Sequence, residues 1–317
     1  MILYIFIDGI GFGKNTPDTN PFAKFPTEFF SPLAEITIPN SSKFHEMIYV
    51  KTDASMGVEG LPQSATGQTA IWTGINAPSA IQRHVSGYPT FTLKKIISKY
   101  SILKILTEHK IKCGFLNCYS PLYFEQIKKN PRQVSASTLI QMAAGIPFKT
   151  IEDLRNGKGL YMDITHEFLR VIGKNYLDPT DDLLIPRDPF QMGERLYENS
   201  KDYDLAVFEY FLTDKVGHDR NWENAERVIS TLELFFQGIL THFNPDKDQL
   251  IVTSDHGNLE DLSTNKHTSN LVPTILFGKY SDSMSKKIKS LYDIVPEIYS
   301  VFDLNIFLNQ KEFLNHS

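Results

Sequence analysis

The chain opens with Ile2-Leu-Tyr-Ile-Phe-Ile7 and continues directly into Asp8-Gly-Ile-Gly11. A continuous apolar run that is rich in β-branched and aromatic residues is typical of a central strand buried on both faces. The glycines that follow Asp8 indicate a turn at the end of this strand. In open α/β sheets, ligands bind beyond the carboxyl ends of the strands, so we expect Asp8 at a functional edge.

Further apolar runs of the same character occur along the chain and alternate with segments of helical period. The runs are 114–119, 204–211, 249–253 and 272–277. Apolar side chains recur at helical spacing over 93–110, 221–243 and 293–302. This alternation predicts an α/β fold with a mainly parallel central sheet and helices on both of its faces.

Two segments do not follow the alternation. Residues 14–44 are rich in Pro, Thr, Ser and Phe, and their aromatic part from Phe22 to Phe44 leaves three roles open: a lid, a partner surface or ordinary core. Residues 121–200 carry scattered prolines between short helical pieces. We therefore predict a metal-binding α/β core over 1–120 and 201–317, and a small inserted cap over 121–200.

Bulk composition excludes some classes of function. The formal net charge of −5 argues against a protein that binds nucleic acid by broad phosphate neutralisation. No apolar run has the length needed to cross a bilayer, so we expect no membrane association. Cys113 and Cys118 cannot form a disulfide framework and are expected to be free thiols in or beside a buried strand. No basic leader precedes the first apolar run, which favours a cytoplasmic location.

Six candidate metal ligands are spread along the chain in a fixed order. They are Asp8, Asp214, His218, Asp255, His256 and His267. Each follows the carboxyl end of a predicted strand or lies in the loop before the next strand, so all six map to one edge of the sheet. The alternative is that they are unrelated polar loop residues. Three carboxylates and three imidazoles can hold two divalent cations, and a pair of cations about 4 Å apart can clamp a phosphoryl group during transfer.

Ser64 is the candidate nucleophile. It begins a short segment, 64–74, that is compatible with a helix. Free N–H groups and the positive end of the helix dipole at this position would face an incoming phosphate. A neighbouring cation can also lower the pKa of the hydroxyl. Two alternatives are a plain helix-capping serine, which contributes about 1 kcal/mol of stability, and Thr66 as a rival nucleophile on the same turn.

Together these motifs resemble the alkaline phosphatase superfamily, and within it the branch of cofactor-independent phosphoglycerate mutase and phosphopentomutase. The phrases that carry the resemblance are Asp8-Gly-Ile-Gly11, Asp214-Lys-Val-Gly-His218, Asp255-His-Gly-Asn258 and His267-Thr-Ser-Asn-Leu-Val-Pro273. The segment that begins Ser64-Ala is more similar to alkaline phosphatase itself, which favours Ser64 over Thr66. The resemblance covers about residues 1–75 and 204–305.

The resemblance implies two metal sites and a covalent intermediate. One metal would be held by Asp214, His218 and His267. The other would be held by Asp8, Asp255 and His256, with Ser64 touching this metal as the nucleophile. The implied reaction is in-line attack on a phosphomonoester, which gives a phosphoserine that water or an acceptor hydroxyl then resolves. Mutase-type relatives usually use manganese and secreted phosphatases zinc. Mixed Asp and His ligands suit either metal, and the expected cytoplasmic location favours manganese.

The chain also departs from the mutase pattern. Its insertion is far shorter, and Gln68 stands where that branch usually has histidine. A short cap offers few means of excluding water, so we favour a phosphatase acting on a small phosphorylated metabolite over a phosphomutase. Arg83 and His84, just after the nucleophile segment, are candidate substrate contacts, because a guanidinium suits phosphate. The alternative for both is a solvated surface position.

The alternatives to a phosphomonoesterase are other hydrolases of the same superfamily and a non-catalytic protein. The segment after Ser64 lacks the sulfatase pattern of a modified Cys or Ser followed by Pro and Arg. Phosphodiesterase and phosphonate hydrolysis stay open, as does the oligomeric state. A non-catalytic, metal-binding regulatory protein on this scaffold would be expected to have lost a ligand or the nucleophile, and no member of the expected set is missing.

Overall fold

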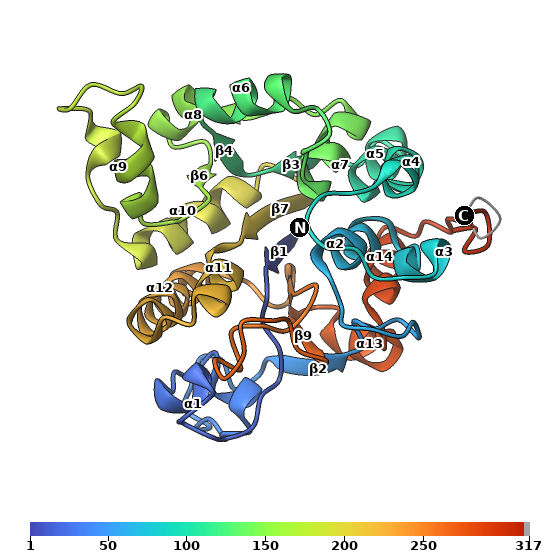
Figure 1. The fold of residues 1–317 in the computed structure, drawn as a ribbon, viewed down its shortest axis with the longest axis horizontal. Helices are drawn as coiled ribbons and strands as arrows, with labels where there is room; N and C mark the ends of the chain where they lie inside the picture. Colours follow the sequence, from blue (N-terminus) through green and yellow to red (C-terminus); the bar gives the residue numbers. More distant parts are fainter. Residues whose placement is uncertain (314–317) are drawn as a thin grey trace.

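The computed structural model describes residues 1–313 and has a six-stranded sheet at its centre (Figure 1). The strand order is β2-β9-β8-β1-β7-β3, with bounds β1 Ile2–Ile7, β2 Ile48–Thr52, β3 Cys113–Phe115, β7 Leu205–Tyr210, β8 Gln249–Thr253 and β9 Val272–Gly278. Strand β1 pairs in parallel with β7 and β8, and β3 pairs in parallel with β7. Only the β8–β9 and β2–β9 pairs are antiparallel. The predicted α/β fold with a mainly parallel sheet is therefore confirmed.

Helices cover both faces of this sheet (Figure 1). The side chains of β1 alternate between two apolar layers, so that Tyr4 and Phe6 face one layer and Leu3 and Ile5 the other. The first layer draws on α2 Ser64–Thr73, α3 Ala77–Ile81, α4 Phe91–Tyr100, α5 Ile102–Glu108, α7 Ala136–Ala144, α13 Ser281–Lys287, η3 Leu291–Asp293 and α14 Ile294–Val301. The second draws on α1 Pro21–Lys24, η1 Ser31–Ala34, α10 Pro189–Ser200, α11 Leu212–Asp219 and α12 Trp222–Thr241.

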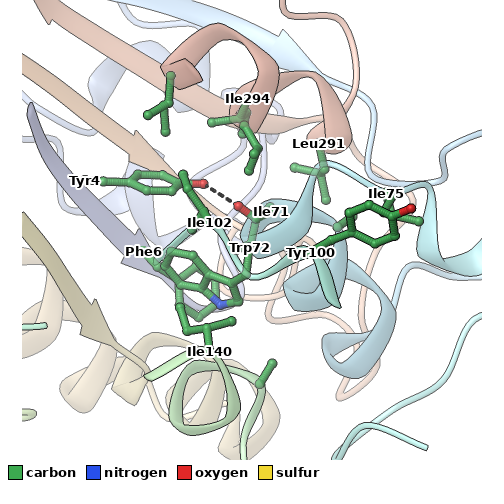
Figure 2. Packing of buried hydrophobic residues seen from close by; sticks show 14 of the residues in the cluster. Tyr4, Phe6, Ile71, Trp72, Ile75, Tyr100, Ile102, Ile140, Leu291 and Ile294 are labelled. Carbon is green, nitrogen blue, oxygen red and sulfur yellow. Dashed lines mark hydrogen bonds between the residues drawn. The ribbon is translucent and has the colours of Figure 1, made fainter. Parts of the chain in front are cut away.

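Trp72 fixes helix α2 against strand β1 (Figure 2). Its ring meets Tyr4 edge-on at a centroid distance of 5.2 Å and Phe6 at 5.8 Å. The Tyr4 hydroxyl also donates a 3.1 Å hydrogen bond to the carbonyl oxygen of Ile71. Such aromatic pairs contribute about 0.5–1.5 kcal/mol each beyond the area they bury. The helix that begins at Ser64 is thus held in a fixed position beside the strand that ends next to Asp8.

The predicted strand over 114–119 is divided between two sheets. Strand β3 belongs to the main sheet, whereas β4 Asn117–Tyr119 pairs with β5 Lys149–Thr150 and β6 Leu160–Tyr161. Asn117 marks the division, because its side-chain amide donates to the carbonyl oxygen of Glu209 and accepts from the N–H of Glu209, both at 2.8 Å. The elements around this second sheet are α6 Pro121–Lys129, α8 Ile151–Arg155, α9 Glu167–Gly173 and η2 Asp182–Leu184 (Figure 1).

The predicted cap, residues 121–200, contributes to the main core as well as to the second sheet. Ala136 and Ile140 of α7 pack in the first apolar layer, and Met192 and Leu196 of α10 pack in the second. The division into a core and a cap at residues 120 and 200 therefore stays a prediction.

The aromatic segment from Phe22 to Phe44 forms ordinary core. The side chains of Phe22, Phe29, Phe30 and Phe44 are completely buried. Phe29 stacks on Phe236 of helix α12 with ring centroids 3.9 Å apart. Burial of this kind excludes the alternatives of a lid or a free partner surface for these rings.

Two further expectations concern the cysteines and the membrane. Cys113 and Cys118 are free thiols in β3 and β4, as predicted. Across residues 1–313, the structure contains no helix whose length and apolar character would suit a membrane span.

Helices α10 and α12 cross with their backbones in contact, and glycines make this possible. A Cβ atom on Gly193 would lie 2.0 Å from the carbonyl oxygen of Phe235, and one on Gly238 would lie 2.0 Å from that of Phe190. Backbone atoms of packed helices cannot move aside as a flexible side chain can. We expect Gly193→Ala to lower the free energy of unfolding by about 3 kcal/mol or more, as measured by urea denaturation.

The matched control for this prediction is Gly57→Ala. Within residues 1–313, no atom beyond the two chain neighbours of Gly57 lies within 4 Å of a Cβ placed there. The φ of +74° at Gly57 opposes a side chain at a cost of about 1–2 kcal/mol. Equal losses of stability in the two variants would contradict the close crossing of α10 and α12.

Candidate metal centre

The six predicted ligands lie at the carboxyl edge of the main sheet. Asp8 follows β1, Asp214 lies in α11 directly after β7, and Asp255 follows β8. His267 reaches the same edge because β9 runs antiparallel to β8, so the loop before β9 lies where β8 ends. The topology therefore brings these loops together, as the order of motifs predicted.

Asp8, Asp255 and His256 form the first group of candidate ligands, and Ser64 lies beside them. Nε2 of His256 is 3.4 Å from Oδ1 of Asp8, 3.5 Å from Oδ2 of Asp255 and 3.0 Å from Oγ of Ser64. One ligand atom from each of Asp8, Asp255 and His256 lies within 4.8 Å of the others. All three side chains are buried. This spacing suits a single ion about 2 Å from each ligand atom.

Asp214, His218 and His267 form the second group. Nε2 of His267 lies 3.2 Å from Nε2 of His218 and 3.6 Å from Oδ1 of Asp214. Nε2 of His218 lies 3.3 Å from Oδ2 of Asp214. Asp214, His256 and His267 also have ligand atoms within 4.8 Å of one another, and the rings of His256 and His267 stack at 3.6 Å. His256 thus lies between the two groups.

Backbone carbonyls fix the tautomers of two of these histidines. Nδ1 of His218 contacts the carbonyl oxygen of Asn265 at 2.9 Å, and Nδ1 of His267 contacts that of Pro62 at 3.0 Å. A carbonyl oxygen only accepts hydrogen bonds, so each Nδ1 carries a hydrogen. In the metal-binding form of a histidine, the lone pair of Nε2 is then free to bind the ion. Two lone pairs that face each other repel unless a cation lies between them. The arrangement therefore suits a metal ion.

The charges of the cluster lead to the same conclusion. Within residues 1–313, no lysine or arginine pairs with Asp8, Asp214 or Asp255. Oδ1 of Asp8 and Nδ1 of His256 are buried and have no hydrogen-bond partner in that part of the chain. Burial, and next the charges of Asp255 and Asp214, raise the pKa of Asp8 well above its usual range. Burial lowers the pKa of His256 to about 3, so the ring is neutral at pH 7. Buried carboxylates beside neutral imidazoles suit divalent cations.

The structure distinguishes Ser64 from its alternatives. The N-cap of helix α2 is Gln63, Ser64 is the first helical residue, and no side chain caps the helix. The interpretation of Ser64 as a plain capping serine is therefore wrong. Thr66 is buried, and its hydroxyl donates to the carbonyl oxygen of Gln63 at 3.0 Å and accepts from the N–H of Val85 at 3.3 Å. Only the Ser64 hydroxyl faces the ligand cluster.

Gln68 also belongs to the cluster, which sequence reasoning missed. Its Nε2 donates to Oδ2 of Asp255 at 3.1 Å and to Oδ2 of Asp8 at 3.4 Å. Gly67 allows this approach, because a Cβ atom there would lie 2.7 Å from the carbonyl oxygen of Asp255. Gln68 is four residues after Ser64, so the two side chains lie on one face of the helix. That spacing was the available signal.

Glu260 is a second residue that the sequence did not reveal. Its buried carboxylate accepts hydrogen bonds from the N–H of Gly11 at 2.9 Å, the N–H of Asn258 at 2.8 Å, the amide of Asn270 at 3.0 Å and the hydroxyl of Thr268. These donors come from the loops that carry Asp8, Asp255 and His267. Glu260 therefore ties three ligand-bearing loops together.

We expect Glu260→Gln to weaken metal binding, although Glu260 is not itself a candidate ligand. The variant replaces one acceptor oxygen by an N–H₂ group, which cannot accept the hydrogen bonds of the surrounding donors. Their loss lowers the free energy of unfolding by about 1–3 kcal/mol. It also lowers metal affinity by about 10–100-fold, since groups that orient ligands have effects of this size. Calorimetric titration with Mn²⁺ measures the affinity. Glu226→Gln, at an exposed position of α12, is the control, and equal affinities in the two variants would contradict this role.

A cavity of about 720 Å³ opens beside Ser64, and Asp8, Gln68 and Asp214 also line it. Arg83 and His84, the predicted substrate contacts, do not belong to its lining. Arg83 is exposed, and Nε2 of His84 lies 3.2 Å from the carbonyl oxygen of Val58. The structure therefore brings together the six predicted ligands and Ser64, but not this pair.

Residues 191–306 match the family model described as the Metalloenzyme superfamily. This segment carries five of the six candidate ligands, all except Asp8. Residues 191–306 are therefore similar to the metalloenzyme superfamily. The candidate metal-binding groups draw on this segment and on Asp8. They support a metal-dependent enzyme.

Curated relatives of this chain are named 2,3-bisphosphoglycerate-independent phosphoglycerate mutase. The protein from Thiobacillus denitrificans is 32% identical over 134 residues, which is 39% of this chain and 26% of the relative. The protein from Coxiella burnetii is 31% identical over the same shares of the two chains. The match thus spans about a quarter of the length of these relatives.

Solved structures with the same fold extend over nearly the whole chain. The PH0037 protein from Pyrococcus horikoshii has a TM-score of 0.56 at 13% identity, and the match covers 97% of this chain and 98% of that one. Alkaline phosphatase from the Antarctic bacterium TAB5 has a TM-score of 0.52 at 16% identity, with 96% and 98% coverage. The predicted alkaline-phosphatase-like fold is confirmed, and the curated matches agree with the predicted similarity to phosphoglycerate mutases.

Proposed function

We propose that this chain is a two-metal-dependent phosphomonoesterase that acts on a small phosphorylated metabolite through a phosphoserine at Ser64. One observation supports this function above the others. Oγ of Ser64 and the carboxylates of Asp8 and Asp255 surround the same nitrogen, Nε2 of His256, within 3.5 Å. A hydroxyl that close to a set of metal ligands is placed to act as a nucleophile.

In this proposal the two groups of residues hold one divalent cation each. Asp8, Asp255 and His256 hold the first beside Ser64, and Asp214, His218 and His267 hold the second. When bound, the cations supply charge stabilisation for the attacking and leaving oxygens of the phosphoryl group. Manganese and zinc both suit these ligands, and we favour manganese.

The residues of the chain itself position the reacting groups. Ser64 loses its hydroxyl proton to solvent, and its oxygen forms a bond to phosphorus while the ester bond on the opposite side breaks. The departing alkoxide takes a proton from water. A water molecule then attacks the phosphoserine and releases inorganic phosphate, which restores the hydroxyl. Gln68 holds the carboxylates of Asp8 and Asp255 in position near the attacking oxygen through its hydrogen bonds to both.

A panel of phosphorylated metabolites and 4-nitrophenyl phosphate, assayed with Mn²⁺ and with Zn²⁺, tests this function. We expect phosphate release only with added metal and loss of release after chelation. Metal-independent release, or metal binding with no turnover of any ester, would contradict the proposal. The second outcome would favour a non-catalytic regulatory protein on the same scaffold.

A phosphomutase is the second candidate, because the curated relatives are named as mutases. The two candidates differ only in the group that takes the phosphoryl from Ser64. Reaction in ¹⁸O-labelled water separates them, since a phosphatase releases labelled phosphate whereas a mutase returns an unlabelled phosphorylated isomer. We expect labelled phosphate.

A further inference from the structure

The cavity beside Ser64 offers almost no positive charge to a substrate. Among the residues that line it, Lys215 is the only lysine or arginine. Lys215 is exposed, and its Nζ pairs with Oδ2 of Asp219 at 2.8 Å. The part of the substrate that enters the cavity is therefore not a second anion, such as the carboxylate of a phosphorylated sugar acid.

The carboxylate of Glu209 lines the same cavity and accepts a hydrogen bond from the side chain of Ser137. Glu209 lies opposite Phe6 in the pairing of β7 with β1, two residues before the position of Asp8. Asn117 fixes its backbone through two hydrogen bonds of 2.8 Å. Within residues 1–313, no lysine, arginine or histidine forms an ion pair with it. Burial raises its pKa to about 7, so the site favours a partner that compensates the charge.

Tyrosine rings line the cavity together with Glu209. Tyr119 and Tyr123 line the cavity and stack with centroids 4.9 Å apart. Burial raises the pKa of both phenols, and the charge of Glu209 raises it further. The amide of Gln141 donates to the Tyr119 hydroxyl at 2.7 Å, and the Tyr123 hydroxyl contacts Thr138. These bonds hold the rings in place, and Tyr88 adds a third ring to the lining.

We propose that Glu209 and these tyrosines bind the ammonium group of a phosphorylated amino alcohol whose phosphate lies at Ser64. Aromatic faces beside a carboxylate are a recognised site for organic cations. From the strand register, the Cα atoms of Glu209 and Asp8 are about 8 Å apart. A substrate with a short carbon chain between its phosphate and its ammonium group therefore reaches both sites. This inference rests on the proposed phosphomonoesterase function and adds the class of its leaving group.

Matched substrates test the inference. Phosphocholine and 3,3-dimethylbutyl phosphate have the same shape and differ in the charge of the leaving group, and phosphoethanolamine separates a primary from a quaternary ammonium. We expect kcat/KM for at least one ammonium ester to exceed that of the neutral ester by about 10-fold or more. Glu209→Gln is expected to bring this ratio close to 1, whereas the exposed Glu226→Gln leaves the wild-type ratio intact.

Binding provides a second readout that does not depend on turnover. Calorimetric titration of the metal-loaded Ser64→Ala variant with each ester reports the same preference, and Glu209→Gln in that background is expected to remove it. Turnover of 4-nitrophenyl phosphate by the wild type with equal kcat/KM for charged and neutral esters would overturn this inference and leave the proposed function standing. No turnover of any ester would overturn both.

Discussion

Ser64→Ala is expected to lower kcat/KM by about 10³-fold or more while metal binding continues. The variant removes only the oxygen that would form the bond to phosphorus, and loss of a nucleophile has effects of at least this size. The six candidate ligands keep their positions, because Trp72 and Tyr4 hold helix α2 without any contribution from the Ser64 hydroxyl. Metal content by atomic emission and kcat/KM with 4-nitrophenyl phosphate are the two measurements.

The control for this prediction is Ser86→Ala, at an exposed position after helix α3. It is expected to keep wild-type activity and metal content. Wild-type turnover by Ser64→Ala would remove Ser64 from the mechanism. Trapping a phosphorylated wild-type protein with labelled substrate, and finding the label on the peptide that contains Ser64, would support the assignment independently.

Asp8→Asn is expected to act in opposite directions with and without metal. In the metal-free protein, Asp8 lies near the charges of Asp255 and Asp214 with no lysine or arginine partner among residues 1–313. The neutral amide relieves this repulsion, and we expect the free energy of unfolding to rise by about 1 kcal/mol or more at pH 7. The same change removes a ligand, so the stabilisation of the wild type by excess Mn²⁺, about 3 kcal/mol at a 100-fold excess over Kd, is expected to be lost.

The pH dependence of this effect has a definite sign. The pKa of Asp8 is higher in the folded protein than in the unfolded chain. In the pH interval between these two pKa values, Asp8 is therefore protonated in the folded protein and ionised in the unfolded chain. The stability of the metal-free wild type therefore falls as the pH rises through that interval. The gain from Asp8→Asn is expected to be larger at pH 8 than at pH 5. Thermal unfolding with and without metal measures it, and Asp246→Asn, which is exposed, is the control. Lower stability of metal-free Asp8→Asn would contradict the repulsive cluster.

The local pattern of the sequence was sufficient for the elements that carry the ligands. Strand β1 is buried at every position, as its continuous apolar run predicted. Helix α12 follows its apolar stripe closely. The direction of β9 was not predictable in this way, since an apolar run has the same composition in a parallel or an antiparallel strand. It is the antiparallel pairing with β8 that brings His267 to the edge.

Interactions between distant segments explain what the sequence did not reveal. The predicted helix over 93–110 is divided at Ser101, whose hydroxyl donates to the carbonyl oxygen of Ile140 at 3.0 Å and whose extended backbone ends α4 and begins α5. Glu260 accepts a hydrogen bond from Gly11, which lies far away in sequence, and Gln68 reaches carboxylates that follow two other strands. Neither partner could be identified from the neighbouring residues alone. The same is true of Glu209, which lines one cavity with tyrosines that lie far away in sequence.

The two-metal centre itself is tested most directly by anomalous diffraction from crystals grown with Mn²⁺ or Zn²⁺ and inorganic phosphate. We expect two anomalous peaks about 4 Å apart. One peak is expected to be bound by Asp8, Asp255 and His256 and the other by Asp214, His218 and His267, with phosphate between them and Oγ of Ser64. A single peak, or peaks bound by other residues and separated from Ser64 by solvent, would contradict the account.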